Sequence, residues 1–266
     1  MPAPENQFKA ALREDRFQLG FWLALASPYL AEVLSGSGYD WLLIDGEHAP
    51  NDIPLLSAQL QAVAGSGSHP MVRLPVGEAW LIKQILDAGA QTLLIPMVES
   101  VEQAKALVRA VRYPPHGIRG VGAGLGRASS FSRIGDYLET ANDQICLVVQ
   151  IESRAGLKEI EGIAALDGID GLFIGPSDLA ADMGYLGQPG HPDVTAAIAD
   201  GFEKIGHAGK ARGIMTLDLE QARLYRDMGA TFMAIGTDVT LLVSATTKLR
   251  DDFLQTGNKD KPISGY

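Results

Sequence analysis

The 266-residue sequence lacks the features that mark secreted and membrane proteins. It has a single cysteine, Cys146, so no disulfide can form within the chain, and a reducing compartment is favoured. No apolar run approaches the roughly 18 residues that a membrane span needs, and the opening stretch MPAPENQFKAALRED has no apolar core like that of a signal peptide. We therefore expect a cytoplasmic protein that does not bind or span a membrane.

Positive charge is also scarce. The sequence has 22 Lys and Arg residues against 32 Asp and Glu residues, which gives a formal net charge of −10. Nucleic acids and anionic membrane surfaces are polyanions, so this charge disfavours both as partners. It says little about small anionic substrates, which respond to the local field of a pocket.

Eight short apolar runs alternate with segments of helical periodicity along the chain. Most of these runs are apolar on both faces, as parallel strands covered by helices are. They span residues 17–25, 39–45, 70–75, 92–98, 145–152, 169–175, 213–218 and 231–236. Eight such units predict one α/β domain over residues 1–266, a (β/α)8 barrel, with an open doubly wound sheet as the alternative.

The C-terminal part of the sequence differs from the rest. Residues 237–255 predict a last helix with an exposed apolar side, which is suited to a subunit contact. Residues 256–266, TGNKDKPISGY, predict a loosely ordered tail.

Polar side chains follow six of the predicted strands at the end where barrel enzymes carry their chemistry. One polar strand end would mean little, because most are solvated loop entries. Six at one rim favour a functional face. They are Asp45 with Glu47 and His48, Arg73, Gln150 with Glu152, Asp178, Asp218 and Asp238.

Glu152 and Asp178 follow neighbouring predicted strands, whose ends lie about 5 Å apart. Two carboxylates that close repel each other unless a cation lies between them. An oxygen-only pair with no cysteine nearby suits a hard ion such as Mg²⁺ or Mn²⁺. The alternative is structural: each acid caps the following helix or pairs with Arg154.

Arg73 and His48 each have two interpretations. An arginine inside the apolar strand PMVRLP is costly unless it is paired. Arg73 is therefore either an ion-pair partner of Asp45 or Glu47, or a clamp for a substrate oxyanion or carboxylate. His48 can act as a base near neutral pH, although a lone loop histidine is more often simply solvated.

Several segments of the chain closely resemble the HpcH/HpaI aldolases. The resemblance rests on YDWLLIDGEHAPND, VRLP, IKQILDAGAQTLLIPMVES, YPPHGIRGVG, VVQIESRAGL and GIDGLFIGPSDLAADMG, and it covers nearly the whole chain. Members of that family are metal-dependent class II pyruvate aldolases, typified by 4-hydroxy-2-oxoheptanedioate and 2-dehydro-3-deoxyglucarate aldolases. The resemblance implies a (β/α)8 barrel that exchanges its last helix between subunits, in a hexamer built as a trimer of dimers.

The resemblance also implies a metal and pyruvate site. In it Glu152 and Asp178 are ligands of a divalent ion (Mg²⁺, Mn²⁺ or Co²⁺), and Gln150 lies at the metal and pyruvate. Arg73 contacts the pyruvate oxygen, and Ser177 offers a backbone N–H to the pyruvate carboxylate. Trp22 and Phe173 fall on positions that line the pocket.

His48 matches the catalytic histidine of these aldolases, with Asp45 close by and Asp87 as its dyad partner. Asp87 ends the helix before the fourth predicted strand, away from the rim that holds His48. Our hypothesis is therefore that Asp87, if it is the dyad partner, comes from a neighbouring subunit, with action within its own subunit as the alternative.

The reaction implied is the reversible cleavage of a 4-hydroxy-2-oxo acid to pyruvate and an aldehyde. No lysine lies at a predicted strand end, which argues against an enzyme that forms a Schiff base. The first alternative is a CoA-ester lyase resembling the citrate lyase β-subunit, whose nucleotide groove would have only Arg119, Arg127 and Arg133 to supply charge. The second is a non-catalytic scaffold.

Overall fold

The computed structural model describes residues 1–255 and contains a closed barrel of eight parallel strands. The strands pair in chain order, and β8 closes on β1. They are β1 (Gln18–Leu23), β2 (Trp41–Asp45), β3 (His69–Arg73), β4 (Thr92–Ile95), β5 (Cys146–Ile151), β6 (Gly171–Ile174), β7 (Ala211–Met215) and β8 (Phe232–Thr237). Each overlaps one predicted run, so the (β/α)8 prediction is confirmed and the open-sheet alternative is wrong.

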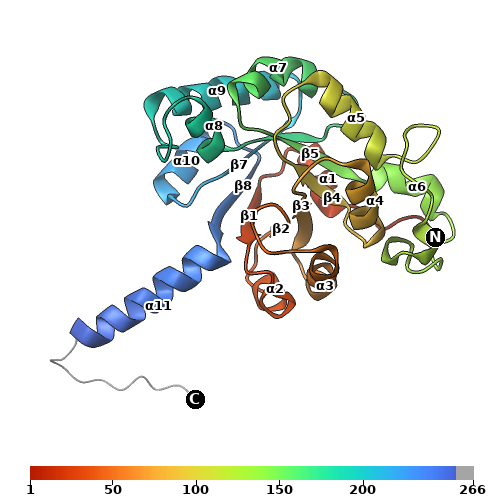
Figure 1. Cartoon of the computed structure of the whole chain (residues 1–266), viewed down its shortest axis with the longest axis horizontal. Coiled ribbons are helices and arrows are strands. Elements are labelled where there is room, and N and C mark those ends of the chain that lie inside the picture. The colour runs from red at the N-terminus through yellow and green to blue at the C-terminus, as the bar shows by residue number, and fades with distance from the viewer. Residues whose placement is uncertain (256–266) are drawn as a thin grey trace.

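Helices pack around this barrel, and the last one, α11, extends away from it (Figure 1). They are α1 (Gln7–Arg13), α2 (Pro28–Ser35), α3 (Ile53–Val63), α4 (Ala79–Asp87), α5 (Val101–Val111), α6 (Tyr137–Gln144), α7 (Arg154–Ala164), α8 (Pro176–Asp182), α9 (Pro192–His207), α10 (Leu219–Asp227) and α11 (Asp238–Gln255). Within residues 1–255, none of them has both the length and the apolarity to cross a membrane.

Five helices begin at a Ser or Asp whose side chain accepts the N–H three residues later, which satisfies an otherwise unpaired donor of the first turn. The capping residues are Ser27, Asp52, Ser100, Ser153 and Asp218. Asp218 at the predicted rim is therefore a structural cap. Asp238 is also structural, because its carboxylate accepts the N–H groups of Ala24 and Leu25.

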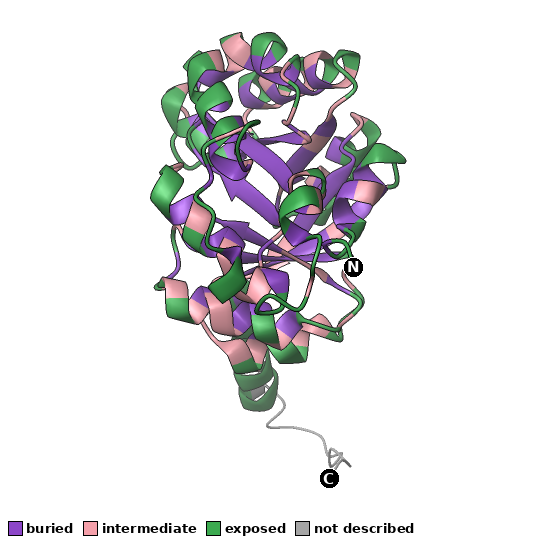
Figure 2. Ribbon diagram, turned by 90° about the vertical axis from the view of Figure 1, so that its right-hand side faces the viewer, coloured by how far each residue is buried: buried purple, intermediate pink, exposed green. Residues whose placement is uncertain are grey.

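The core has two layers, because alternate residues of each strand face opposite sides. Figure 2 shows the buried strands enclosed by helices whose outer sides are exposed. Inside the barrel, Trp41, Phe173 and Phe232 pack with Phe8 of α1, which covers the N-terminal end of the barrel. Cys146 lies in this inner layer and is fully buried.

Two strand glycines make room for these aromatic rings. A Cβ atom at Gly20 would lie 2.1 Å from Cε2 of Trp41, and one at Gly213 would lie 2.1 Å from Cζ of Phe232. Both distances are far below van der Waals contact, so larger residues at these positions would force the inner layer apart.

Helix α11 leaves the barrel and extends outward (Figure 1). Its apolar side chains Leu241, Leu242, Leu249 and Phe253 are exposed. The predicted last helix is thus present, and its role as a subunit contact stays a prediction. The predicted loose tail, residues 256–266, lies outside the described residues.

Candidate active site

A cavity of about 240 Å³ opens at the C-terminal ends of the strands. This is the rim at which the sequence places the functional residues. Side chains from β1, β2, β3, β5, β6 and the β6–α8 turn meet there. They include Trp22, Asp45, Arg73, Gln150, Phe173, Ser177 and Asp178.

The register of the barrel brings Asp45 and Arg73 together, because they are directly opposed on β2 and β3. Nε and Nη2 of Arg73 donate to the two carboxylate oxygens of Asp45 at 2.9 and 2.6 Å. Trp22 Nε1 also donates to Asp45, and the Arg73 guanidinium lies 4.8 Å from the centroid of the Trp22 ring. Burial alone would raise the pKa of Asp45, but the hydrogen bonds and charge of Arg73 outweigh burial and hold that pKa below its usual value.

Glu47 and His48 continue this network toward solvent. Glu47 Oε2 lies 2.9 Å from Nη1 of Arg73 and 3.8 Å from Nε2 of His48. Burial raises the pKa of Glu47, and the charge of Arg73 opposes that rise without reversing it. The His48 side chain is exposed, so it is open to a substrate or a water molecule on one side and held by Glu47 on the other.

Glu152 is buried, and each of its carboxylate oxygens accepts a hydrogen bond. Oε1 accepts the backbone N–H of Met97 at 2.7 Å, and Oε2 accepts the side-chain amide of Gln150. The pKa of Glu152 is raised to about 7, mainly by burial and in smaller part by the charges of Asp178 and Glu47, and the two hydrogen bonds oppose this rise. The acids from three strand ends therefore act on one another, and Glu47 joins the pair of Glu152 and Asp178 that the sequence predicts.

These residues fit a divalent cation. The charge of a cation would relieve the repulsion around Glu152, and Oε1 of Gln150 is buried without a hydrogen-bond partner in the described chain. Asp178, in the first turn of α8, makes no side-chain hydrogen bond or ion pair there and lines the cavity. Residues 1–255 contain no group of three or more His, Cys, Asp or Glu side chains that could hold a metal by themselves, so an ion at Glu152 and Asp178 would need water or substrate oxygens to complete its shell.

The structural alternative for the two acids is wrong. Ser153, rather than Glu152, caps α7, and Arg154 pairs with Asp182 at 3.0 Å. Gly175 is the N-cap of α8, and no side chain caps that helix.

Asp87 lies apart from this network. It ends α4 and binds Nη2 of Arg119 at 2.7 Å, and no hydrogen bond or ion pair joins it to His48 within the described chain. Its role as a dyad partner stays a prediction that requires a second subunit.

Sequence reasoning named Glu47 only as a possible ion-pair partner of Arg73, gave it no role in catalysis, and did not identify Met97. The structure shows that Arg73 pairs with both Asp45 and Glu47. Met97 contacts Glu152 through its backbone N–H, so its side-chain type could not have predicted the contact.

Known proteins resemble this chain over almost its full length. Residues 18–245 match the model of the HpcH/HpaI aldolase/citrate lyase family. A hydroxypyruvate/pyruvate aldolase of Roseovarius nubinhibens is 60% identical over 91% of this chain and 94% of the relative. A 4-hydroxy-2-oxo-heptane-1,7-dioate aldolase of Escherichia coli is 52% identical over 97% and 98%.

Solved structures agree with the family match. An HpcH/HpaI aldolase/citrate lyase family protein from Burkholderia cenocepacia superimposes with a TM-score of 0.90 at 45% identity, covering 93% of this chain and 99% of that one. The chain belongs to the HpcH/HpaI aldolase/citrate lyase family.

Proposed function

We propose that this protein is a divalent-metal-dependent aldolase that reversibly cleaves 4-hydroxy-2-oxo acids to pyruvate and an aldehyde. The observation that carries the proposal is the cavity at the strand ends, which Arg73, Gln150 and Asp178 line together. The buried Glu152 carboxylate lies behind Gln150 and accepts its amide. Such a site suits a small oxyanion together with its counter-ion. Relatives that are 52–60% identical bear the names of pyruvate and 4-hydroxy-2-oxo acid aldolases.

Cleavage leaves negative charge on the 2-oxo oxygen of the pyruvate half. Arg73 has five N–H groups, of which Asp45 accepts two, and Glu47 forms an ion pair with Nη1. N–H groups on both terminal nitrogens are therefore left for that oxygen. A divalent ion held by Glu152 and Asp178, next to the Gln150 amide oxygen, would supply Lewis-acid stabilisation of the same charge.

In this proposal His48 takes the proton from the C4 hydroxyl, directly or through water; support comes from its exposed ring at the end of β2 and from Glu47 Oε2, which lies 3.8 Å from Nε2. The backbone N–H of Ser177, at the start of α8, would bind the carboxylate. Trp22 and Phe173, whose ring centroids lie 6.0 Å apart, form an apolar wall that limits water.

The CoA-ester lyase alternative has less support. Of the three arginines suited to a CoA groove, Arg119 is fully buried and paired with Asp87, and Nη1 of Arg133 donates to the Ser130 carbonyl. Arg119 is therefore closed to a nucleotide phosphate.

The function is tested by a pyruvate-release assay over a panel of 4-hydroxy-2-oxo acids, with and without EDTA. We expect EDTA to abolish release and added Mg²⁺ or Mn²⁺ to restore it. Asp178→Asn should lower kcat/KM at least about 100-fold, whereas Asp182→Asn, on the same helix, should keep near wild-type activity. Release that survives complete metal removal contradicts the metal dependence, and cleavage of CoA thioesters alone would favour the lyase.

A further inference from the structure

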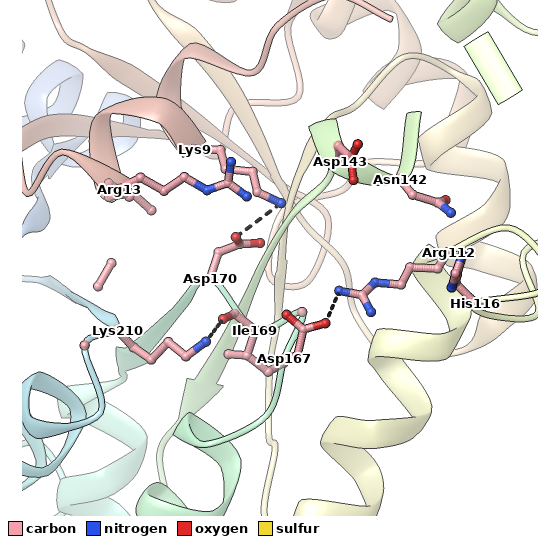
Figure 3. A pocket seen from close by; sticks show the side chains of 14 residues that line it. Lys9, Arg13, Arg112, His116, Asn142, Asp143, Asp167, Ile169, Asp170 and Lys210 are labelled. Carbon is pink, nitrogen blue, oxygen red and sulfur yellow. Dashed lines mark hydrogen bonds and ion pairs between the residues drawn. The ribbon is translucent and has the colours of Figure 1, made fainter. Parts of the chain in front are cut away.

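A second cavity, of about 470 Å³, opens at the opposite end of the barrel. It lies at the N-terminal ends of β5, β6 and β7, between α1, the end of α5 and α6 (Figure 3). None of its lining residues belongs to the catalytic cavity.

The lining of this second cavity is basic although the chain is acidic. Four Lys and Arg side chains and one His outnumber three Asp side chains there, whereas the whole chain carries a net charge of −10. Figure 3 shows the cations on two facing walls: Lys9 and Arg13 extend from α1, and Arg112 and His116 lie across from them. Lys210 completes the lining from the loop before β7.

Structural contacts account for part of this charge. Lys9 Nζ binds the Ile145 carbonyl and lies 3.2 Å from Asp170. Lys210 Nζ donates to the Ile169 carbonyl at 2.7 Å. Arg112 pairs with Asp167 at 3.0 Å, but that carboxylate is almost fully exposed, so the pair adds little stability.

Other donors at the cavity have no partner within residues 1–255. The Arg13 guanidinium and the His116 imidazole make no hydrogen bond or ion pair there. Asn142 is oriented by its neighbour, because Oδ1 accepts the Tyr113 N–H at 2.8 Å, and this leaves its NH₂ group for a ligand. Arg112 also keeps N–H groups beyond those that Asp167 uses.

We propose that this cavity binds a small organic dicarboxylate. One carboxylate binds Arg13 on the α1 wall, and the other binds Arg112 and His116 on the facing wall. The cavity volume suits a molecule of several carbons. Asp143, Asp167 and Asp170 also line the cavity and repel an anion near them, so a ligand that holds one carboxylate at each basic wall fits better than one compact phosphate.

Calorimetry with succinate as the probe tests the site. The titration uses the whole chain at low ionic strength, with Mg²⁺ and saturating pyruvate present so that the catalytic cavity is filled. We expect one succinate per chain and about tenfold weaker binding to Arg13→Gln, because one charge-assisted contact is lost. Arg13 is exposed and unpaired in the described chain, so this variant should fold. Arg223→Gln, which changes the net charge equally on exposed α10, should bind succinate normally.

Four results would overturn the proposal. Arg13→Gln could bind succinate as tightly as the wild type, or both variants could weaken binding equally, which would indicate general charge attraction. If inorganic phosphate binds as tightly as succinate, and Arg13→Gln weakens that binding too, the cavity does not select a dicarboxylate. A wild-type chain that binds no succinate under these conditions contradicts the site itself.

Discussion

The fold shifts the pKa of Glu152 far enough to make the stability of the protein depend on pH. Burial raises its pKa from 4.5 to about 7. Between these values the folded chain holds a proton that the unfolded chain has lost, so in metal-free protein the free energy of unfolding falls as pH rises from about 4.5 to about 7. The full effect is at most about 3 kcal/mol.

We predict that Glu152→Gln removes this loss of stability. Denaturant unfolding of metal-free protein between about pH 5 and about pH 8 measures it, with Glu161→Gln, an exposed glutamate of α7, as the control. Burial lowers the pKa of His69 to about 4, so His69 makes the free energy of unfolding rise with pH over this range. His69 is present in every variant, so its contribution cancels when the variants are compared. Identical pH slopes for wild type and Glu152→Gln would contradict the shifted pKa.

Sequence reasoning at this scale identified which residues reach the rim but not how they pair there. Arg73 could be an ion-pair partner or a substrate clamp, and the barrel register shows that it pairs with Asp45 and still keeps free N–H groups. Register depends on contacts between strands far apart in the chain, so a local sequence window cannot reveal it.

At the scale of elements, the eight strands were predictable because buried parallel strands are continuously apolar. The residues at which the strands end were harder to predict. The fourth run was expected to reach residue 98, but β4 ends at Ile95 because Pro96 has no N–H for the ladder. Met97 then adopts a φ of 53° and directs its N–H at Glu152. Such a conformation is rare for a residue other than glycine, so the sequence gives no warning of it.

The turn from β6 into α8 depends on Gly175. A Cβ atom there would lie 2.6 Å from Oε2 of Glu152 and 3.0 Å from Nε2 of Gln150, while its φ of −90° suits any residue. We therefore expect Gly175→Ala to displace the Glu152 carboxylate and weaken Mn²⁺ binding about tenfold or more, with little change in unfolding. Calorimetric Mn²⁺ titration measures this, and Gly135→Ala, whose Cβ meets nothing within 4 Å, is the control. Unchanged Mn²⁺ affinity in Gly175→Ala would show that this turn does not position Glu152 for metal binding.

On the scale of the whole molecule, α11 has an apolar side that nothing within residues 1–255 of a single chain covers. Leu242, Leu249 and Phe253 recur at helical spacing and form one apolar stripe, which is exposed on a helix that projects from the barrel (Figure 1). An exposed stripe of this kind marks a surface that another protein covers. We propose that a second copy of the chain covers it, as part of a hexamer.

This assembly predicts a joint loss of association and catalysis. We expect Leu242→Lys/Leu249→Lys to sediment as monomers in analytical ultracentrifugation, because each lysine would bury an unpaired charge in the interface. The control Ser244→Lys/Thr247→Lys adds the same charge on the other side of α11 and should sediment like the wild type. In one chain Asp87 binds Arg119 and makes no hydrogen bond or ion pair with His48 within residues 1–255. If Asp87 serves His48 of a neighbouring subunit, the monomers should therefore lose aldolase activity while they still bind Mn²⁺. Monomers that remain fully active would rule out that role for Asp87, and an unchanged sedimentation coefficient would rule out α11 as the subunit contact.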